Sequence, residues 1–371
     1  MEFFANGYKN LKDVSFLADP KMNIFCGENA QGKTNLMEAI WLCSGCRSFR
    51  GTKDKDFIAF DGDAAHVRLV FSDRQRNQEI SFSVQRDNPK DKRVTLNGVK
   101  LPLMSKLFGV FKCISFIPDD LKLSKGAPDG RRLFLDLCVS QIKHGYVSAL
   151  NKYENALSQR NATLKEIAAG RCSPDDLDMW DVQLADAGSY ISVLRNAYAG
   201  KLGGFCAPMY SRLSKGKENL KLYYRSTVFE SLDGRFDHKG ELYEEYLQKL
   251  KSGRESDIRL GFTQSGTHRD DLEIEINGIS VKDFGSQGQQ RSAALVMKLS
   301  QAKILLDETG EAPVMLLDDV LSELDASRQD FVLNEIDGMQ LFVTCCDPTT
   351  VLRHRMGKVF YMRDGGIIAE R

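Results

Sequence analysis

The sequence predicts an α/β fold in which a mixed sheet and an antiparallel β subdomain are interrupted by a helical insertion. Three observations support this class. A glycine-rich loop follows a short apolar strand near the N-terminus, and an apolar strand that ends in two aspartates lies near the C-terminus. Between them, two stripes of apolar residues repeat with heptad spacing, which is typical of paired helices.

The composition is that of a globular protein without a membrane span. The chain has 371 residues, of which 42% are hydrophobic and 27% are charged, and its 51 basic and 51 acidic residues cancel. Zero net charge gives no general attraction to a polyanion, so DNA binding would need a local patch or a second subunit. No apolar run reaches the roughly 18 residues of a transmembrane helix. The odd number of cysteines and the absence of a secretion signal favour a cytoplasmic protein.

The glycine-rich loop lies between a predicted strand and a predicted helix. The run 22–27 is apolar and ends in glycine, and the residues after Lys33 are apolar at helical spacing. Residues 64–100 alternate apolar and polar side chains, which predicts antiparallel strands with a turn at Asn97 and Gly98.

The middle of the chain carries the two matched stripes. The first consists of Leu135, Val139, Ile142, Tyr146, Ala149, Tyr153 and Ala156, and the second of Leu177, Trp180, Leu184, Ala187, Ile191, Leu194 and Tyr198. Ser173, Pro174 and Asp176 are suited to start the second helix. The pattern predicts an antiparallel hairpin with arms of about 25–40 residues each, and ordinary core helices of a bundle are the alternative. A strand within 219–229 and a helix within 240–252 follow.

Strands return near residue 260. The remaining predicted strands lie within 271–281, 312–320, 339–347 and 358–370. We therefore assign residues 1–125 and 260–371 to a discontinuous head domain and residues 126–259 to a helical arm domain.

The glycine-rich loop matches the phosphate-loop pattern G-x-x-x-x-G-K-T. Its backbone N–H groups can surround phosphates, because glycines at both ends let the chain turn sharply. Lys33 would reach the β- and γ-phosphates of a nucleotide, and the Thr34 hydroxyl would bind Mg²⁺. The predicted cofactor-binding residues of the loop are Gly27, Glu28, Asn29, Ala30, Gln31, Gly32, Lys33 and Thr34.

A second motif is the strand "VMLLDDVLSELD". It carries Asp318 to the strand end, where the carboxylate is placed to hold Mg²⁺, and Asp319 to a position where it can orient or deprotonate an attacking water. Alone, two solvated acids at a strand end would be as good an explanation. Together with the phosphate loop, the motif favours a catalytic role for Asp319.

A third motif is "GSQGQQRS", which precedes a predicted helix and offers a second anion site at its N-terminus. One ATP does not need two such sites from one subunit. The simplest arrangement is a dimer in which Ser286, Gly288 and Gln289 of one chain complete the site of the other. A glutamine-rich turn without a ligand is the alternative.

Taken together, these stretches resemble the ABC-type ATPase head shared by SMC, Rad50 and RecF proteins, and among these the RecF family. The resemblance rests on "GENAQGKTNLMEAI", "GCRSFR", "DDLKLSKGAPDGRRLFLD", "THRDDLEIEINGISVKDFGSQGQQRSAAL" and "LLDDVLSELD". It implies that Lys33 and Thr34 bind ATP and Mg²⁺, that Ser286 acts across a dimer with catalytic Asp319, and that Asp325 lies near the subunit boundary.

The same resemblance implies a biological role. It implies a cytoplasmic, weakly DNA-stimulated ATPase that dimerises on ATP and binds double-stranded DNA at gaps and junctions. With RecO and RecR, such a protein helps to load RecA in gap repair and the SOS response.

The sequence departs from the wider class in three places. Pro118 and Asp119 stand where relatives have a glutamine that contacts the metal, Thr344 stands where they have a histidine, and the first strand starts late. The Thr344 replacement is consistent with slow turnover.

For DNA contacts, the sequence offers a basic cluster after the first helix and two arginines at the start of the arm. These residues are Arg47, Arg50, Lys53, Lys55, Arg131 and Arg132. Contacts from such side chains to the phosphate backbone would be salt-dependent and largely independent of base sequence. A solvated basic surface is the alternative.

Two other functions compete. An ABC transporter subunit would have a histidine after "LFVT" and no long helical arms, and an SMC-type clamp would need longer coiled coils. The Cys43–Cys46 stretch has C-x-x-C spacing, but no second ligand pair accompanies it, so we expect the end of a buried helix there.

Overall fold

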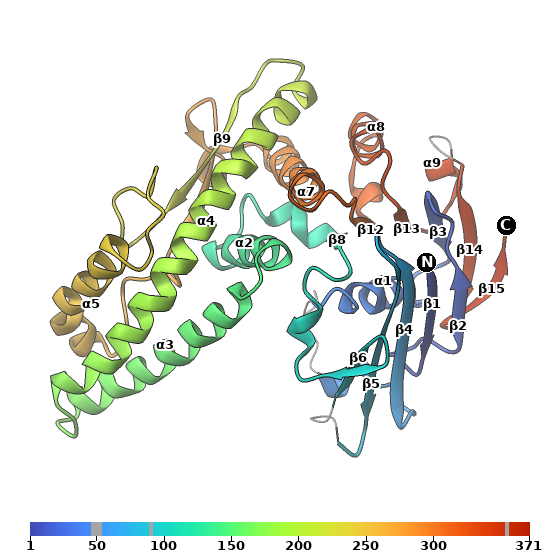
Figure 1. Ribbon diagram of the computed structural model, residues 1–371. Helices are drawn as coiled ribbons and strands as arrows, with labels where there is room; N and C mark the ends of the chain where they lie inside the picture. The colour runs from blue at the N-terminus through green and yellow to red at the C-terminus, as the bar shows by residue number, and fades with distance from the viewer. Residues whose placement is uncertain (46–53, 89–91, 353–355) are drawn as a thin grey trace. The chain divides into compact units, whose positions relative to one another are not determined.

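The computed structural model describes residues 1–45, 54–88, 92–352 and 356–371 of the chain. The chain forms two compact units, Met1–Leu121 with Lys298–Arg371 and Lys122–Met297 (Figure 1). The first boundary lies close to the expected one. The expected head also includes residues 260–297, whereas the structure groups them with the inserted unit, because a strand at 271–276 pairs with a strand at 220–225.

The central sheet of the first unit is mixed, as expected. Its strands run in the order β15-β14-β3-β13-β12-β8. They are β3 (Met22–Cys26), β8 (Cys113–Phe116), β12 (Val314–Asp318), β13 (Leu341–Cys345), β14 (Lys358–Arg363) and β15 (Gly366–Glu370). All neighbouring pairs are parallel except β14 with β15. The parallel strands therefore all end at one edge of the sheet, which is where ligands bind in open α/β sheets.

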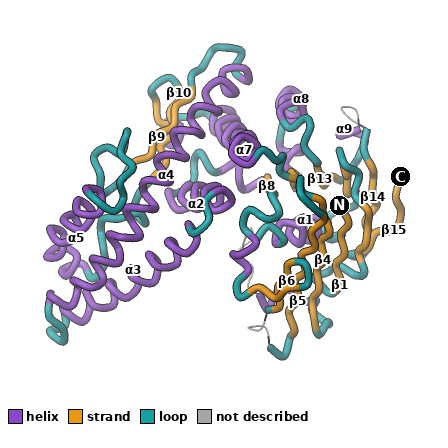
Figure 2. Tube along the Cα trace, viewed as in Figure 1, coloured by secondary structure: helices purple, strands orange, loops and turns teal. Residues whose placement is uncertain are grey.

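A second, antiparallel sheet in the same unit has the order β2-β1-β4-β5-β6-β7. Its strands are β1 (Glu2–Asn6), β2 (Val14–Leu17), β4 (Ala64–Ser72), β5 (Asn77–Gln85), β6 (Arg93–Leu96) and β7 (Val99–Leu101). The predicted turn at Asn97 and Gly98 joins the last two strands, with φ of 52° and 78°. Figure 2 shows these strands and those of the mixed sheet in orange.

Aromatic packing joins the two sheets. The ring of Phe16 on β2 lies 5.1 Å from both Phe25 on β3 and Phe360 on β14, and these two rings stack at 4.9 Å. All three side chains are buried. Aromatic rings at this spacing contribute stabilising energy beyond that of their buried area, so this packing stabilises the contact between the two sheets.

The helices of the first unit are short, apart from α7. They are α1 (Lys33–Leu42), α8 (Ala326–Glu335), α9 (Thr349–Leu352) and the 3₁₀ turns η1 (Asp54–Phe57), η2 (Met104–Leu107), η3 (Pro118–Lys122) and η5 (Val320–Glu323). The helix α1 packs on β8, β12 and β13. The unit boundary falls within α7 (Gln287–Thr309), which is buried from Ser292 to Ala302.

The second unit is largely helical. It contains α2 (Pro128–Ile142), α3 (Tyr146–Ala168), η4 (Pro174–Leu177), α4 (Asp178–Leu213), α5 (Glu241–Leu260), α6 (Val281–Phe284) and a small sheet of β9 (Leu220–Arg225), β10 (Asp271–Ile276) and β11 (Ile279–Ser280). The helix α4 packs against α3, α5 and β9. Ser173 and Asp176 form a capping box before α4, as the sequence predicts.

One expectation about the arm is wrong. The first apolar stripe is divided between two helices, α2 and α3, because the chain turns at Gly145, whose φ is 90°. Ile142 closes one helix and Tyr146 opens the next, so heptad spacing continues across the break. The paired helices of the arm are therefore α3, with 23 residues, and α4, with 36.

Buried ion pairs supplement the apolar core of the second unit. The Arg160 guanidinium is fully buried between Asp181 at 2.6 Å and Asp257 at 2.7 Å, and Arg195 pairs with Asp136 at 2.8 Å. Removing one partner would leave a buried charge without compensation, so these pairs fix the relative positions of α3, α4 and α5. Within the described ranges, the helices are too short or too polar for any of them to traverse a bilayer.

Candidate nucleotide-binding site

The sequence-predicted residues of the phosphate loop and the acidic strand meet at the carboxyl edge of the mixed sheet. The strand β13 lies between β3, which leads into the loop, and β12, which ends in Asp318. Residues almost 300 positions apart in sequence are therefore brought to one edge, where an open α/β sheet offers a ligand site.

Steric constraints in the phosphate loop require glycine at positions 27 and 32. Gly32 precedes α1 with φ of 98°, in the left-handed region that glycine tolerates. A Cβ on Gly27 would lie 2.5 Å from the carbonyl oxygen of Met362 on β14. The non-glycine Ala30 also has a positive φ, of 65°. The loop is therefore tightly curved and packed against a neighbouring strand.

Lys33 is the first residue of α1, and its side chain folds back onto the phosphate loop. Its side chain is 4% exposed, and Nζ donates to the carbonyl oxygens of Gly27 at 2.6 Å and Glu28 at 2.9 Å. The ammonium is thus held over the loop by two neutral acceptors. A phosphate would offer it a charged acceptor in the same place, which is a stronger interaction.

The side chains of Asn10 and Gln31 brace the loop, and sequence reasoning missed the first of them. The amide of Asn10 donates to the Ala30 carbonyl at 3.2 Å and accepts from Asn35 at 2.7 Å. The Gln31 side chain accepts from the backbone N–H of Asp364 at 2.5 Å, in the turn between β14 and β15. No sequence pattern marks Asn10, because its partners lie 20 and 25 positions away.

A chain of hydrogen bonds joins the loop to the acidic strand. Thr34 Oγ1 donates to Asp318 Oδ1 at 3.1 Å, and Thr344 Oγ1 donates to the same oxygen at 2.9 Å. The N–H of Asp319 then donates to Thr344 Oγ1 at 2.8 Å. Thr344 therefore holds both aspartates in place.

The donor set of this chain fits Mg²⁺. The Thr34 hydroxyl and the Asp318 carboxylate are hard oxygen ligands in direct contact, as phosphate-loop proteins use for this ion. Within the described residues, no group of three or more His, Cys, Asp or Glu side chains could hold a metal alone. Phosphate oxygens and water would supply the remaining ligands.

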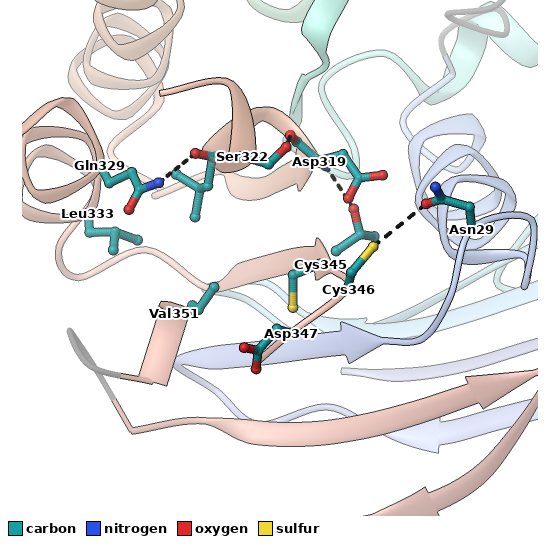
Figure 3. A pocket seen from close by; sticks show the side chains of 11 residues that line it. Asn29, Asp319, Ser322, Gln329, Leu333, Cys345, Cys346, Asp347 and Val351 are labelled. Carbon is teal, nitrogen blue, oxygen red and sulfur yellow. Dashed lines mark hydrogen bonds between the residues drawn. The ribbon is translucent and has the colours of Figure 1, made fainter. Parts of the chain in front are cut away.

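Asp319 faces a pocket of about 540 Å³ beside the loop (Figure 3). Its φ of 53° lies in the left-handed region, which aspartate adopts more readily than most residues other than glycine. Asn29 of the loop and Cys346 after β13 line the same pocket. The pocket thus contains the carboxylate predicted to be catalytic and one residue of the phosphate loop.

Sequence reasoning also missed the cysteines at this edge. Cys346 is exposed, with Sγ 3.6 Å from Asn29 Oδ1 and 4.0 Å from the Lys33 ammonium. Burial, with nearby Cys26 and Asp319, raises the pKa of the Cys345 thiol to about 12. Of this adjacent pair, Cys346 is therefore the thiol open to reagents.

The other predicted motifs near the site have local roles in the structure. The side chain of Asp325 caps the N-terminus of α8, and the N–H of Arg328 donates to it at 3.0 Å. This hydrogen bond lowers the pKa of the Asp325 carboxyl. Pro118 and Asp119 form the start of η3 directly after β8, and Asp119 is exposed.

The third motif lies in the second unit. Ser286 is exposed and begins α7: the N–H of Gln289 donates to Ser286 Oγ at 3.2 Å, and the N–H of Ser286 donates to Gln289 Oε1 at 2.9 Å. This is a reciprocal cap of a 23-residue helix. Gly288 lies in the first turn of α7. In this chain the Gln289 side chain is engaged in the cap.

The predicted DNA contacts have a mixed outcome. Arg47, Arg50 and Lys53 lie outside the described residues, and Lys55 lies in η1.

The assignment of Arg131 to a DNA-contacting surface needs correction. This side chain is 2% exposed, and its guanidinium pairs with both oxygens of Asp271 at 2.7 and 2.8 Å. Arg131 forms a structural ion pair, and its buried, paired charge is not accessible to a phosphate of DNA. Arg132 is half-buried and donates to the Asp270 carbonyl at 2.8 Å.

The end of α1 agrees with the expectation for the C-x-x-C stretch. Cys43 and Gly45 are buried directly after the helix, while Cys46 lies outside the described residues. Burial raises the pKa of Cys43 to about 12, so its thiol is an inert packing group.

Comparison with known proteins places this geometry in a family. The family model described as RecF/RecN/SMC N terminal domain matches residues 1–368. A "DNA replication and repair protein RecF" of Lachnoclostridium phytofermentans is 37% identical over 340 residues, covering 92% of this chain and 90% of that protein. The protein of the same name from Clostridium acetobutylicum is 36% identical over 368 residues, covering 99% and 98%.

Solved structures agree. The "recombination mediator protein RecF-ATPrS in RecFOR pathway" superposes with a TM-score of 0.91 at 35% identity, covering 99% of this chain and 97% of that one. The corresponding RecF-ATP structure gives 0.90 at 34%, covering 100% and 96%. An SMC head bound to a ScpA domain gives 0.57 at 15% identity over 100% of this chain and 96% of that one, which shows the shared ATPase head fold alone.

Proposed function

The chain belongs to the RecF family of DNA replication and repair proteins, and from that premise we propose that it binds ATP with Mg²⁺ and uses them to close a dimer on DNA. The observation that carries the proposal is the contact between Thr34 and Asp318, which joins the phosphate loop to the acidic strand across the sheet edge. Structures of similar proteins described with ATP and an ATP analogue support the choice of nucleotide.

In this proposal the first unit binds the nucleotide. Backbone N–H groups of the loop and the Lys33 ammonium bind the phosphates, and Thr34 and Asp318 are the protein ligands of Mg²⁺. The ion would supply charge neutralisation at the phosphates. Asp319 orients the attacking water and accepts its proton, and the hydrogen bond from its N–H to Thr344 keeps the carboxylate beside the loop.

The second unit supplies the other half of a site to a partner chain. Ser286 is exposed at the N-terminus of a long helix, where N–H groups and the helix dipole favour an anion. Ser286 and Gly288 of one chain would contact the terminal phosphate bound by the other. Hydrolysis would then remove the shared ligand and release the dimer, so the ATPase acts as a slow switch.

The wider role follows from the family. We propose that the closed dimer binds double-stranded DNA next to single-strand gaps and junctions, that it works with RecO and RecR to load RecA, and that DNA weakly stimulates its ATPase. We propose a cytoplasmic location and a role in DNA repair and the SOS response. Contacts to DNA would be mostly to the phosphate backbone. With zero net charge, two chains together would build the basic surface.

DNA binding measured over a salt series, with and without ATP, tests the proposal. We expect ATP to strengthen binding, and the logarithm of the affinity to fall linearly with the logarithm of salt concentration. Lys33→Ala should remove the effect of ATP, while Lys12→Ala, an exposed lysine of the same unit, should leave it. Equal DNA affinity with and without ATP in the wild type would overturn the switch.

A further inference from the structure

The cap formed by Ser286 and Gln289, here called the signature cap, contacts the end of the long arm helix α4 through Glu218. Glu218 lies in the connection between α4 and β9. Its Oε1 accepts from Gln289 Nε2 at 2.7 Å, and its Oε2 accepts from the Tyr210 hydroxyl at 2.9 Å. Tyr210 is on the last turns of α4 and is 1% exposed. One carboxylate therefore contacts both the arm helix and the first turn of α7.

The position of Glu218 is itself well defined. Ser214 Oγ accepts from the N–H of Glu218 and donates to its carbonyl oxygen, both at 3.3 Å. The following Asn219 exchanges two hydrogen bonds of 2.9 Å with Asn277, in the turn between β10 and β11. The backbone on both sides of the carboxylate is thus held by neighbouring elements, so the carboxylate is a fixed acceptor.

The orientation of the Gln289 amide depends on this acceptor. A glutamine amide has one oxygen and one NH₂ group, and rotation exchanges them. Because the NH₂ group donates to Glu218, the oxygen faces Ser286 and accepts its N–H. In the reverse orientation, the amide would present NH₂ to the N–H of Ser286, and this hydrogen bond of the cap would be lost. Ser286 is therefore positioned by a residue 68 positions earlier.

We propose that Glu218 is a positioning residue for the signature serine and couples the end of α4 to Ser286. This inference rests on the proposed function, in which Ser286 acts on ATP held by a partner chain. It deepens that function by naming a route from the arm helix to the shared site. The phosphate loop belongs to the other unit, so nucleotide binding by a single chain does not depend on Glu218.

Three variants test the proposal. Glu218→Ala removes the acceptor, Glu218→Gln keeps an oxygen that accepts from Gln289, and Glu154→Ala changes an exposed glutamate on α3 as a control. We expect Glu218→Ala to lower kcat for ATP by about tenfold, as the loss of a charge-assisted hydrogen bond implies. The affinity of the single chain for a non-hydrolysable ATP analogue should stay unchanged. Glu218→Gln should recover most of the rate.

Hydrogen exchange in the nucleotide-free chain provides a readout that needs no dimer. The N–H of Ser286 should exchange about tenfold faster in Glu218→Ala than in the wild type, and near the wild-type rate in Glu218→Gln. Gln289→Ala should have the same effect, and the double variant should add nothing further. An unchanged exchange rate for Ser286 in Glu218→Ala would overturn the proposal, whether or not ATP drives dimerisation.

The positioning role of Glu218 and the proposed shared ATP site can be contradicted separately. If the wild type hydrolyses ATP as a dimer but Glu218→Ala does so equally well, the positioning role is wrong and the proposed function stands. If Glu218→Gln is as impaired as Glu218→Ala in both assays, the acceptor role is also wrong. If exchange at Ser286 responds as expected but the wild type never dimerises, the cap is correct and the shared-site function fails.

Discussion

The phosphate loop and the "GSQGQQRS" stretch before α7, here called the signature loop, are both glycine-containing turns before a helix, but they are built differently. The phosphate loop is supported by segments from both ends of the chain, and its key groups contact one another: Lys33 the loop carbonyls, and Thr34 the carboxylate of Asp318. The signature loop is closed by its own Ser286 and Gln289, and Ser286 is exposed.

The two loops differ in whether one chain provides all the groups of a binding site. In the first unit, the hydroxyl, carboxylate and ammonium are already assembled, so this half is prepared to bind a nucleotide on its own. In the second unit, Ser286 at the N-terminus of α7 is exposed, and we propose that it contacts a phosphate bound by a partner chain. A half-site of each kind in every chain is what a dimer with two shared sites requires. The predictions below test this division, beginning with the largest expected effect.

Asp319→Asn should abolish hydrolysis while nucleotide binding persists. Loss of a general base lowers rates by about 10²–10⁴-fold. Asparagine also tolerates the φ of 53° at this position, so the backbone should stay as it is. Single-turnover hydrolysis measures the rate, and the ATP-bound dimer should accumulate. Asp13→Asn, at an exposed position with φ of 45°, is the matched control. Near-normal hydrolysis in Asp319→Asn would remove this residue from the mechanism.

Lys33→Ala should abolish nucleotide binding. The variant loses a charged donor to phosphate, worth about 3 kcal/mol or about a hundredfold in affinity. Titration with a fluorescent ATP analogue measures this, with Lys12→Ala as the control. Binding within a few-fold of the wild type would mean that the loop does not hold the phosphates.

Gly365→Ala should destabilise the protein far more than Gly278→Ala. Both glycines lie in hairpin turns, with φ of 81° and 79°. A Cβ at Gly365 would lie 1.7 Å from the carbonyl oxygen of Asn10, which braces the phosphate loop, whereas one at Gly278 would meet nothing within 4 Å. Urea unfolding should show losses of roughly 2–4 and about 1 kcal/mol, respectively. Equal losses would contradict the long-range support of the loop.

Acid should weaken the second unit through His268. Burial lowers the pKa of this imidazole to about 4. Its neutral ring contacts the Tyr153 hydroxyl at 2.8 Å and the Thr263 carbonyl at 3.1 Å. The unfolded chain binds a proton below about pH 6.5, and the folded chain does so only near pH 4. The stabilisation is therefore complete above pH 6.5 and is lost as pH falls toward 4, by about 2 kcal/mol at pH 5.

The difference between wild type and His268→Gln isolates this contribution. Between pH 7.5 and pH 5, the free energy of unfolding should fall more in the wild type than in His268→Gln. The other titrating groups act equally in both proteins, so the difference belongs to His268. Parallel pH profiles would show that folding does not lower the pKa of His268.

Cys346 should be protected by ATP from thiol reagents. It lines the pocket beside Asp319, whereas Cys172, also exposed, lies in the loop between α3 and α4 and is an internal control. At a free ATP concentration ten times the dissociation constant, alkylation of Cys346 should slow about tenfold. Mass spectrometry of the two peptides measures this. Equal protection of both cysteines, or of neither, would place the nucleotide elsewhere.

Local patterns predicted most of the elements, and distant contacts explain what they missed. The strand before Gly27 and the turn at Gly98 follow from short-range spacing alone. The break at Gly145 was hidden because the apolar repeat continues through it. The burial of Arg131 could not be inferred, since its partner Asp271 lies 140 positions away. Asn10 acts through partners 20 and 25 positions away and Glu218 through one 71 positions away, so no short motif marks either residue.

The central claim is that ATP joins two half-sites from two chains. Light scattering with and without saturating ATP, in the presence of DNA, tests it most directly. We predict that ATP raises the mass from that of the 41.7 kDa chain toward twice that value. Ser286→Arg should stay at the lower mass while still binding nucleotide. A wild-type protein that remains a monomer at saturating ATP with DNA present would contradict the account.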